Sequence, residues 1–177
     1  MGDGQLGETR ESVDDQALTE EMTTDEFDRM MGIVADGIIG AAGGLVGTAL
    51  MTVVLLVAES LGAFSRASFA ELTRLVGLGG YVPEITFGYL LFLAGGMVPW
   101  PLLFASLMEY LPGERMPVNG IFFGTALWTG FVLAFYDGFA GTTLVLYLVL
   151  TLVAHWVYGA SLGFVFEYLS TRPETLV

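Results

Sequence analysis

The sequence predicts an all-α membrane protein with four transmembrane helices, arranged as two hairpins that repeat one another in parallel. Of its 177 residues, 54% are hydrophobic and only 14% are charged, which is too apolar for an ordinary soluble domain. Four uncharged stretches are each long enough to cross a bilayer, for which about 20 residues are needed. The hexamers GTALMT at 47–52 and GTALWT at 124–129 place nearly the same residues in the first and third stretches.

Residues 1–31 are expected to form an acidic, largely flexible cytoplasmic tail. Ten Asp or Glu residues precede residue 30, and such a segment buries too little apolar surface to fold alone. Thr23 and Glu26 have the spacing of a capping box, which predicts a short helix near 24–31. The tail lacks the basic region and short apolar core of a cleavable signal peptide, so the first span is expected to be the anchor.

The transmembrane domain is expected to cover residues 32–170, followed by a short C-terminal tail at 171–177. Its four spans are predicted at about 37–58, 85–108, 118–136 and 140–166. Acidic residues flank these spans and thereby limit how far each helix slides through the bilayer. The spans are too long for the strands of a membrane β-barrel and lack their alternation of apolar and polar residues.

The loop at 59–84 is long enough to hold a short interfacial helix. Ser68 and Glu71 have capping-box spacing, and Phe69, Leu72 and Val76 share one helical face. We therefore expect about two turns of helix lying along the membrane surface. Three glycines that follow are expected to stop this helix: Gly77, Gly79 and Gly80.

Orientation is predicted from arginine, because the sequence has no lysine. Arg29, Arg115 and Arg172 fall on the side of both termini, and Arg66 and Arg74 fall on the other side. This distribution predicts that both termini are cytoplasmic in the plasma membrane.

The charge balance points to a halophilic archaeon. The chain has 19 acidic residues, 6 arginines and a net charge of −13, and carboxylate repulsion is screened in molar salt. An acidic tail alone is the alternative explanation. The same balance argues against a nucleic acid partner, because no basic stripe exists to neutralise phosphates. The absence of cysteine excludes disulfides and cysteine nucleophiles.

Two pairs of similar segments, each pair with its own offset along the chain, suggest an internal repeat. The hexamers lie 77 residues apart, whereas EYL at 109–111 and at 167–169 lie 58 apart. An insertion in the first loop reconciles the two offsets, so the chain is predicted to contain two related hairpins.

Glycines four residues apart recur in the spans and predict close helix packing, because helices in lipid associate through small residues. Packing within the bundle is one interpretation, and a homodimer seam on the first span is the other. The glycines concerned are Gly40, Gly44, Gly47, Gly120, Gly124, Gly159 and Gly163.

A polar site is predicted near the middle of the membrane. Pro99 and Pro101 each remove a helix hydrogen bond, so the second span must kink or open there. His155, which shares a face with Thr151 and Tyr158, is expected opposite this break. An ionisable residue at this depth is a candidate functional residue. His155 is expected either to handle a proton or ligand or to make a structural bond to a carbonyl of the second span.

The candidate site also includes two pairs of threonines, and haem is considered as a ligand of it. Thr48 with Thr52, and Thr125 with Thr129, are four residues apart, so each pair points one way; the hydroxyls either bond their own helix or face each other. The sequence predicts no metal and no cofactor, with haem as a weaker alternative. A haem on His155 would need Met51, Met97 or a second subunit's His155 as its other ligand.

The chain resembles a family of small haloarchaeal integral membrane proteins of unknown function. The resemblance covers about residues 32–170 and rests on four segments: GTALMTVVLLVAESLGAFSRASFAELTRLVGLGG, MVPWPLLFASLMEYLPGE, GTALWTGFVLAFYDG and AHWVYGASLGFVFEYL. It implies an archaeal plasma membrane and offers a lead to terminal-oxidase gene neighbourhoods.

We therefore expect a non-enzymatic structural or accessory subunit, in a larger membrane complex such as a respiratory oxidase or in a homodimer. A small transporter or channel with a site around His155 and the Pro99–Pro101 break is the alternative.

Overall fold

The computed structural model describes residues 31, 32, 34 and 37–170, and all regular structure in these residues is helical. The chain divides into two units, Met1–Asp36 and Gly37–Val177, and the description below concerns the second. The helix predicted near 24–31 and the C-terminal tail at 171–177 lie outside the described residues, apart from Met31.

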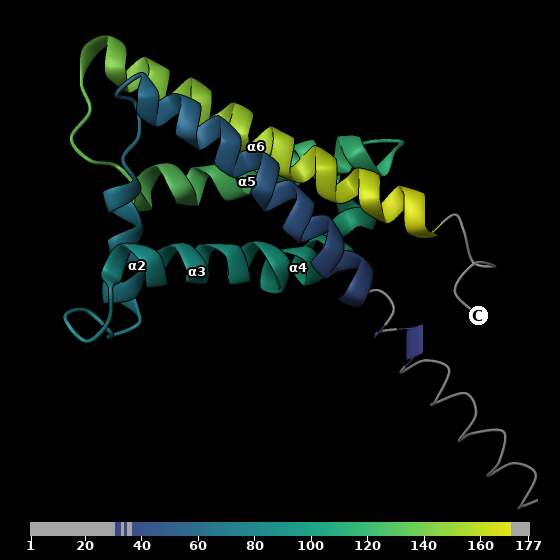
Figure 1. Ribbon diagram of the computed structural model, residues 1–177. Helices are drawn as coiled ribbons and strands as arrows, with labels where there is room; N and C mark the ends of the chain where they lie inside the picture. The colour runs from purple at the N-terminus through teal and green to yellow at the C-terminus, as the bar shows by residue number, and fades with distance from the viewer. Residues whose placement is uncertain (1–30, 33, 35–36, 171–177) are drawn as a thin grey trace, which may run out of the picture. The chain divides into compact units, whose positions relative to one another are not determined.

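Four helices are long and apolar enough to cross a membrane. They are Gly37–Ser60, Glu84–Tyr110, Met116–Ala134 and Gly141–Leu169, so the prediction of four sufficiently long apolar helices is confirmed. The first of these, Gly37–Ser60, is called the first span below. The third is α5 (Met116–Ala134), and the fourth is part of α6 (Gly141–Ser170). Figure 1 shows α6 beside both α5 and the first span.

The second span is broken near its middle, as the prolines predict. It consists of α3 (Glu84–Met97), α4 (Pro99–Leu107) and the 3-10 turn η2 (Met108–Tyr110). Val98 separates α3 from α4 with φ −119° and ψ −74°, outside the usual range of a helical residue. The break follows from Pro99 and Pro101, which have no backbone N–H to continue the helix.

The first loop contains a 3-10 helix, η1 (Arg66–Phe69), followed by α2 (Ala70–Leu75). In Figure 1, α2 crosses the end of the bundle at a steep angle to α3. The predicted cap was wrong. Ser65 caps the segment by accepting a hydrogen bond from the Ala67 N–H at 3.2 Å, so Ser68 falls inside η1 and no side chain caps α2.

The loop is held to the start of α3 by Glu84. The buried Thr73 hydroxyl donates to the Glu84 carbonyl at 2.6 Å, and the Glu84 carboxylate accepts from Arg74 Nε at 2.9 Å. The hydrogen bond to Glu84, together with the charges of Glu71 and Glu84, raises the pKa of Arg74 above its usual value. Of the expected helix stops, Gly77 and Gly80 have φ of 79° and 78°, a conformation that suits glycine.

α5 and α6 form a tight antiparallel hairpin joined by the turn at 135–140. A Cβ added at Gly120 would overlap the carbonyl of Gly159, and one added at Gly159 would overlap that of Gly120, so the two backbones touch there. Side chains reinforce the contact in both directions. Trp128 Nε1 donates to Thr151 Oγ1 at 3.0 Å, and Trp156 Nε1 donates to Thr125 Oγ1 at 2.8 Å.

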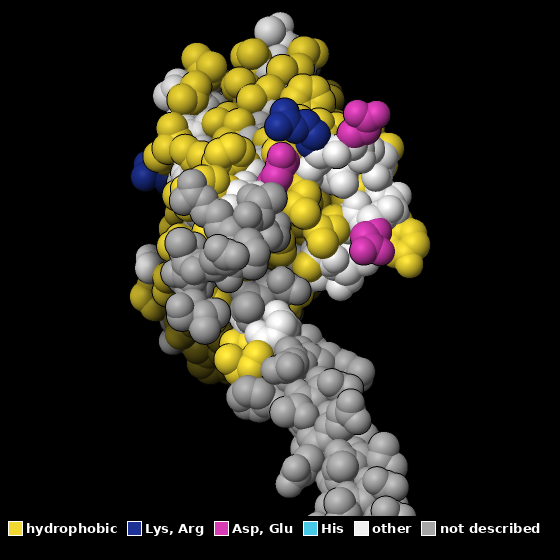
Figure 2. Space-filling view, turned by 90° about the vertical axis from the view of Figure 1, so that its right-hand side faces the viewer, with side chains coloured by type: hydrophobic (Ala, Val, Ile, Leu, Met, Phe, Trp, Pro, Cys, Tyr) yellow, Lys and Arg dark blue, Asp and Glu magenta, His cyan; other side chains and the backbone are white. Residues whose placement is uncertain are grey.

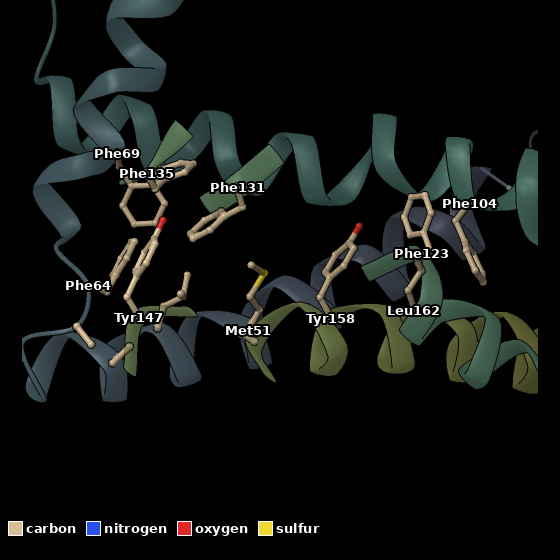
Figure 3. Close-up of a cluster of buried hydrophobic side chains, with 14 of the residues drawn as sticks. Met51, Phe64, Phe69, Phe104, Phe123, Phe131, Phe135, Tyr147, Tyr158 and Leu162 are labelled. Atoms are coloured by element: carbon tan, nitrogen blue, oxygen red, sulfur yellow. The ribbon is translucent and has the colours of Figure 1, made fainter. Parts of the chain in front are cut away.

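The core of this unit contains two groups of aromatic side chains with a less aromatic region between them (Figure 3). One group lies at the end that carries α2, where stacked and edge-on rings join Phe64, Phe69, Phe92, Phe131 and Phe135. The other lies toward the opposite end, where Phe104 packs against Phe123 and Phe166. Between them, Met51 and Tyr158 project toward the broken second span.

The outer surface carries many large hydrophobic side chains, including Ile38 at 66% and Leu133 at 82% exposure. In Figure 2, hydrophobic side chains cover much of the described part of one face, and charged side chains form a few small patches. Such a surface is expected where helices face hydrocarbon instead of water.

Candidate functional site

A crevice of about 480 Å³ lies between α3 and α5 and reaches the middle of the bundle. Its rim includes Leu75, Val76, Trp100 and Gly130, all of which are exposed, so the crevice opens to the surroundings. Its floor is formed by buried residues of the first span and α6: Thr48, Met51, His155 and Tyr158.

Several small residues line the crevice beside its aromatic and aliphatic side chains. Gly95 and Gly96 lie on the α3 side, and Ala126 and Gly130 lie on the α5 side. A Cβ added at Gly130 would meet no atom within 4 Å. Small side chains on both helices leave the space between α3 and α5 unfilled at this level.

His155 is 4% exposed and lines the crevice. Its Nδ1 lies 2.7 Å from the Thr151 carbonyl oxygen, and the edge of its ring meets Phe131 at a centroid distance of 4.7 Å. A carbonyl oxygen only accepts hydrogen bonds, so in the neutral ring Nδ1 carries the proton and Nε2 carries a lone pair. His155 therefore bonds within its own helix, and not to the second span as one interpretation of the sequence expected.

Tyr158 makes the bond to the second span instead. Its hydroxyl donates to the Gly96 carbonyl at 2.8 Å. Gly96 lies in the last turn of α3, where carbonyls lack helical partners because the helix stops at Met97. The sequence placed Tyr158 on the face of His155 without assigning it this bond. Pro99 and Pro101 signalled a helix break with unpaired carbonyls at Gly95 and Met97, but not which carbonyl Tyr158 bonds.

Thr48 is 1% exposed, and its Oγ1 has no hydrogen-bond partner among the described residues. The hydroxyl lies against Gly96, because a Cβ added at Gly96 would overlap Oγ1. A buried hydroxyl without a partner costs about 1–3 kcal/mol relative to a bonded one. The floor of the crevice thus holds an unused polar group beside His155.

The other predicted threonines bond their own helices. Thr52 donates to the Thr48 carbonyl at 2.7 Å, Thr125 to that of Ile121 at 2.9 Å, and Thr129 to that of Ala126 at 2.7 Å. Thr48 and Thr129 line the crevice, with Thr129 exposed at the rim, whereas Thr52 and Thr125 do not line it. Among the described residues, no hydrogen bond joins one threonine pair to the other.

The remaining predicted residues do not line the crevice. Thr151 is fully buried, and its hydroxyl donates to the Tyr147 carbonyl at 2.6 Å. Pro101 is also buried, and its ring atoms lie where a side chain on Gly40 or Gly44 would be. Pro99 is exposed and starts α4.

The predicted packing glycines all lie against other helices of the same chain. The face of the first span that bears glycine contacts α3, α4 and α6, so the surface that a homodimer seam would use is occupied within the chain. The nearest atoms to added Cβ atoms belong to Pro101 for Gly40, Gly96 for Gly44, Tyr158 for Gly47, Gly159 for Gly120, His155 for Gly124, Gly120 for Gly159 and Met116 for Gly163.

Metal ligands do not gather in the described part of the chain, where no group of three or more His, Cys, Asp or Glu side chains occurs. Of the two methionines considered as partners of a haem, Met51 lines the crevice with His155, and Met97 does not line it.

Comparison with protein families matches residues 34–177 to one described as Family of unknown function (DUF6789). Neither the comparison with curated proteins nor that with solved structures finds a match.

Proposed function

Because the chain belongs to the family DUF6789, whose function is unknown, we propose a function from the geometry: a non-enzymatic membrane protein that holds a lipid-soluble molecule in the crevice between α3 and α5. The observation that carries this proposal is the crevice, with an apolar lining and a polar floor at His155 and Thr48. Its volume falls within the range of about 300–1,000 Å³ typical of small-molecule sites, which likewise combine apolar walls with a few polar groups.

The position of the rim supports entry from the bilayer. Trp100 and Gly130 are exposed on helices that are long and apolar enough to span a membrane. A lipophilic molecule can therefore pass from hydrocarbon into the crevice without entering water, where exposure of its apolar surface is unfavourable.

We place this binding function in an accessory subunit of a larger membrane complex, such as a respiratory oxidase. The same proposal places the chain in the plasma membrane of a halophilic archaeon, with both termini in the cytoplasm. It also includes a fold made of two repeated hairpins. These features are supported by the arginine distribution, the lysine-free acidic composition and the two hexamers.

Transport is the second candidate, and the helix break at Val98 favours it. Discontinuous helices beside a midplane site are typical of secondary transporters. A water-filled path for ions would, however, need more polar groups than Thr48, Thr129, His155 and Tyr158 supply among the residues lining the crevice. Flux of an ion or polar solute into liposomes that contain the purified chain would favour transport over storage of a lipophilic molecule.

The proposal is tested by filling the crevice. Gly130→Leu adds a large side chain at the rim of the crevice, where an added Cβ meets no atom within 4 Å, whereas Gly130→Ala adds one methyl group at the same position. After purification in mild detergent, extraction and mass spectrometry should find a lipid-soluble molecule with the wild type and Gly130→Ala, and much less of it with Gly130→Leu. Equal lipid profiles in all three proteins would contradict the proposed function.

A further inference from the structure

We propose that the molecule held in the crevice is a neutral alcohol or phenol with an apolar tail, bound through its O–H group to His155 and Thr48. This inference rests on the proposed function and adds the chemistry of the ligand's head group. It is carried by the hydrogen-bonding capacity that the floor of the crevice leaves unused.

The head group must be neutral. The described residues that line the crevice include no Asp, Glu or Arg, and most of them are aliphatic or aromatic. A carboxylate, phosphate or ammonium group would leave water without gaining a counter-charge, which is costly in an apolar environment. Fatty acids and phospholipid head groups therefore fit this floor poorly.

The head group must also donate a hydrogen bond. His155 Nδ1 is engaged with the Thr151 carbonyl at 2.7 Å, so the neutral ring presents Nε2 as an acceptor. No hydrogen bond to Nε2 is found within the described part of the chain, and His155 lines the crevice. A ligand that only accepts hydrogen bonds, such as a ketone, an ester or an ether, leaves this nitrogen unpaired.

A second group on the floor favours a ligand that accepts as well. Thr48 Oγ1 is buried without a partner, and Thr48 lines the same crevice. A hydroxyl oxygen on the ligand can donate its proton to Nε2 and accept from the Thr48 hydroxyl. Tyr158 does not compete for this role, because its proton is already given to Gly96 at 2.8 Å. An alcohol or phenol carries both the donor that Nε2 lacks and an oxygen that can accept from the Thr48 hydroxyl.

The walls suit a hydrocarbon tail. Phe92 and Leu127 line the crevice between the floor and the rim, and Trp100 lies at the exposed edge. A tail can therefore extend along apolar side chains into the bilayer while the head group stays at the floor. Isoprenoid alcohols, fatty alcohols and prenylated phenols share this design.

The experiment compares geranylgeraniol with geranylgeranyl methyl ether, which has the same tail and lacks the donor. Binding of each to the full chain in lipid nanodiscs is measured by isothermal titration calorimetry. We expect the alcohol to bind about tenfold more tightly, because one buried hydrogen bond separates the two probes. Equal binding, or tighter binding of the ether, would overturn this inference and leave the proposed function standing.

If neither probe binds, this inference is wrong, and the lipid extraction from the wild type and the Gly130 variants decides the proposed function. If the alcohol binds more tightly, variants identify the side chains that bond its hydroxyl group. His155→Leu should remove the preference for the alcohol, and His155→Gln, which retains an acceptor oxygen, should restore part of it. Thr48→Val should weaken alcohol binding severalfold, while Thr48→Ser should not. The comparison of the alcohol with the ether uses the wild-type protein only. The inference can therefore still be tested if a variant fails to fold.

Discussion

At the scale of single residues, the floor of the crevice depends on which buried polar groups are bonded and which are not. Tyr158 bonds across helices, His155 bonds within its own helix, and Thr48 Oγ1 bonds to nothing among the described residues. All three side chains line the same crevice. Tyr158 is therefore expected to stabilise the fold, and the other two to recognise a ligand.

Replacing Tyr158 with Phe should lower stability by about 1–3 kcal/mol, because the Gly96 carbonyl loses its partner in a buried position. The measurement is thermal unfolding in detergent, followed by circular dichroism. Tyr81→Phe is the matched control, since Tyr81 is 83% exposed. Equal melting temperatures for the two variants would show that the bond to Gly96 contributes nothing to stability.

At the scale of helices, glycine serves two opposite purposes in α5. Gly124 allows the backbone of α6 to approach, since an added Cβ would overlap the His155 carbonyl oxygen. Gly130, six residues further along the same helix, faces open space and helps to form the crevice. The sequence alone does not distinguish the two, because both are glycines within an apolar helix.

Gly124→Ala should destabilise the protein by about 1–3 kcal/mol, because overlap between a methyl group and backbone cannot be relieved by a side-chain rotation. Gly130→Ala should be neutral or stabilising by up to about 1 kcal/mol, since alanine favours the helix and meets no neighbour there. Chemical or thermal unfolding in the same detergent compares the pair. A larger loss at Gly130 than at Gly124 would contradict the described contact between α5 and α6.

The attachment of α2 to α3 also separates two kinds of interaction. Thr73 is fully buried and bonds the Glu84 carbonyl, whereas Arg74 reaches the Glu84 carboxylate from an exposed position. Exposed ion pairs contribute about 0–1 kcal/mol, and a buried hydroxyl bond contributes about 1 kcal/mol with a further penalty if a partner is left unpaired.

We therefore expect Thr73→Val to accelerate proteolysis of the first loop more than Arg74→Gln does, because the buried bond holds α2 in place. Limited proteolysis of the detergent-purified variants, with fragments identified by mass spectrometry, measures the rate. Raising the salt concentration should reduce the effect of Arg74→Gln and leave that of Thr73→Val unchanged. The reverse order of rates would assign the anchoring role to the ion pair.

At the scale of the whole molecule, four spans place the loops alternately on the two sides of the membrane. The loop after α2 and the turn after α5 share one side, and the segment between η2 and α5 lies on the other. The chain contains no cysteine, so single cysteines can report these positions without background.

In intact cells, a membrane-impermeant maleimide should label Tyr81→Cys and Asp137→Cys and should leave Glu114→Cys unlabelled until the membrane is opened. All three positions are exposed. This result would support the proposed cytoplasmic termini. The opposite pattern would reverse the orientation and retain four spans, whereas different labelling of Tyr81→Cys and Asp137→Cys would contradict the number of spans.

Features of the whole fold could be predicted where the cause is local. Hydrophobic length predicted the four spans, and the missing N–H groups of Pro99 and Pro101 predicted the break at Val98. The cap at Ser65 was missed because two serines three residues apart both fit a cap. The bond from Tyr158 to Gly96 and the crevice depend on which helices become neighbours, and hydrophobic periodicity carries no such information in spans that are apolar all round.

The central position of α6 has a consequence for the order of assembly. Its residues contact glycines of both the first span and α5, and Tyr158 reaches α3. Among the described helices α6 leaves the ribosome last, so the first span and α3 must wait in the bilayer until most of the chain has been made. Insertion and packing are then separate events in time, and a chain that stops before α6 leaves Gly47, Gly120 and Gly124 without their packing partners.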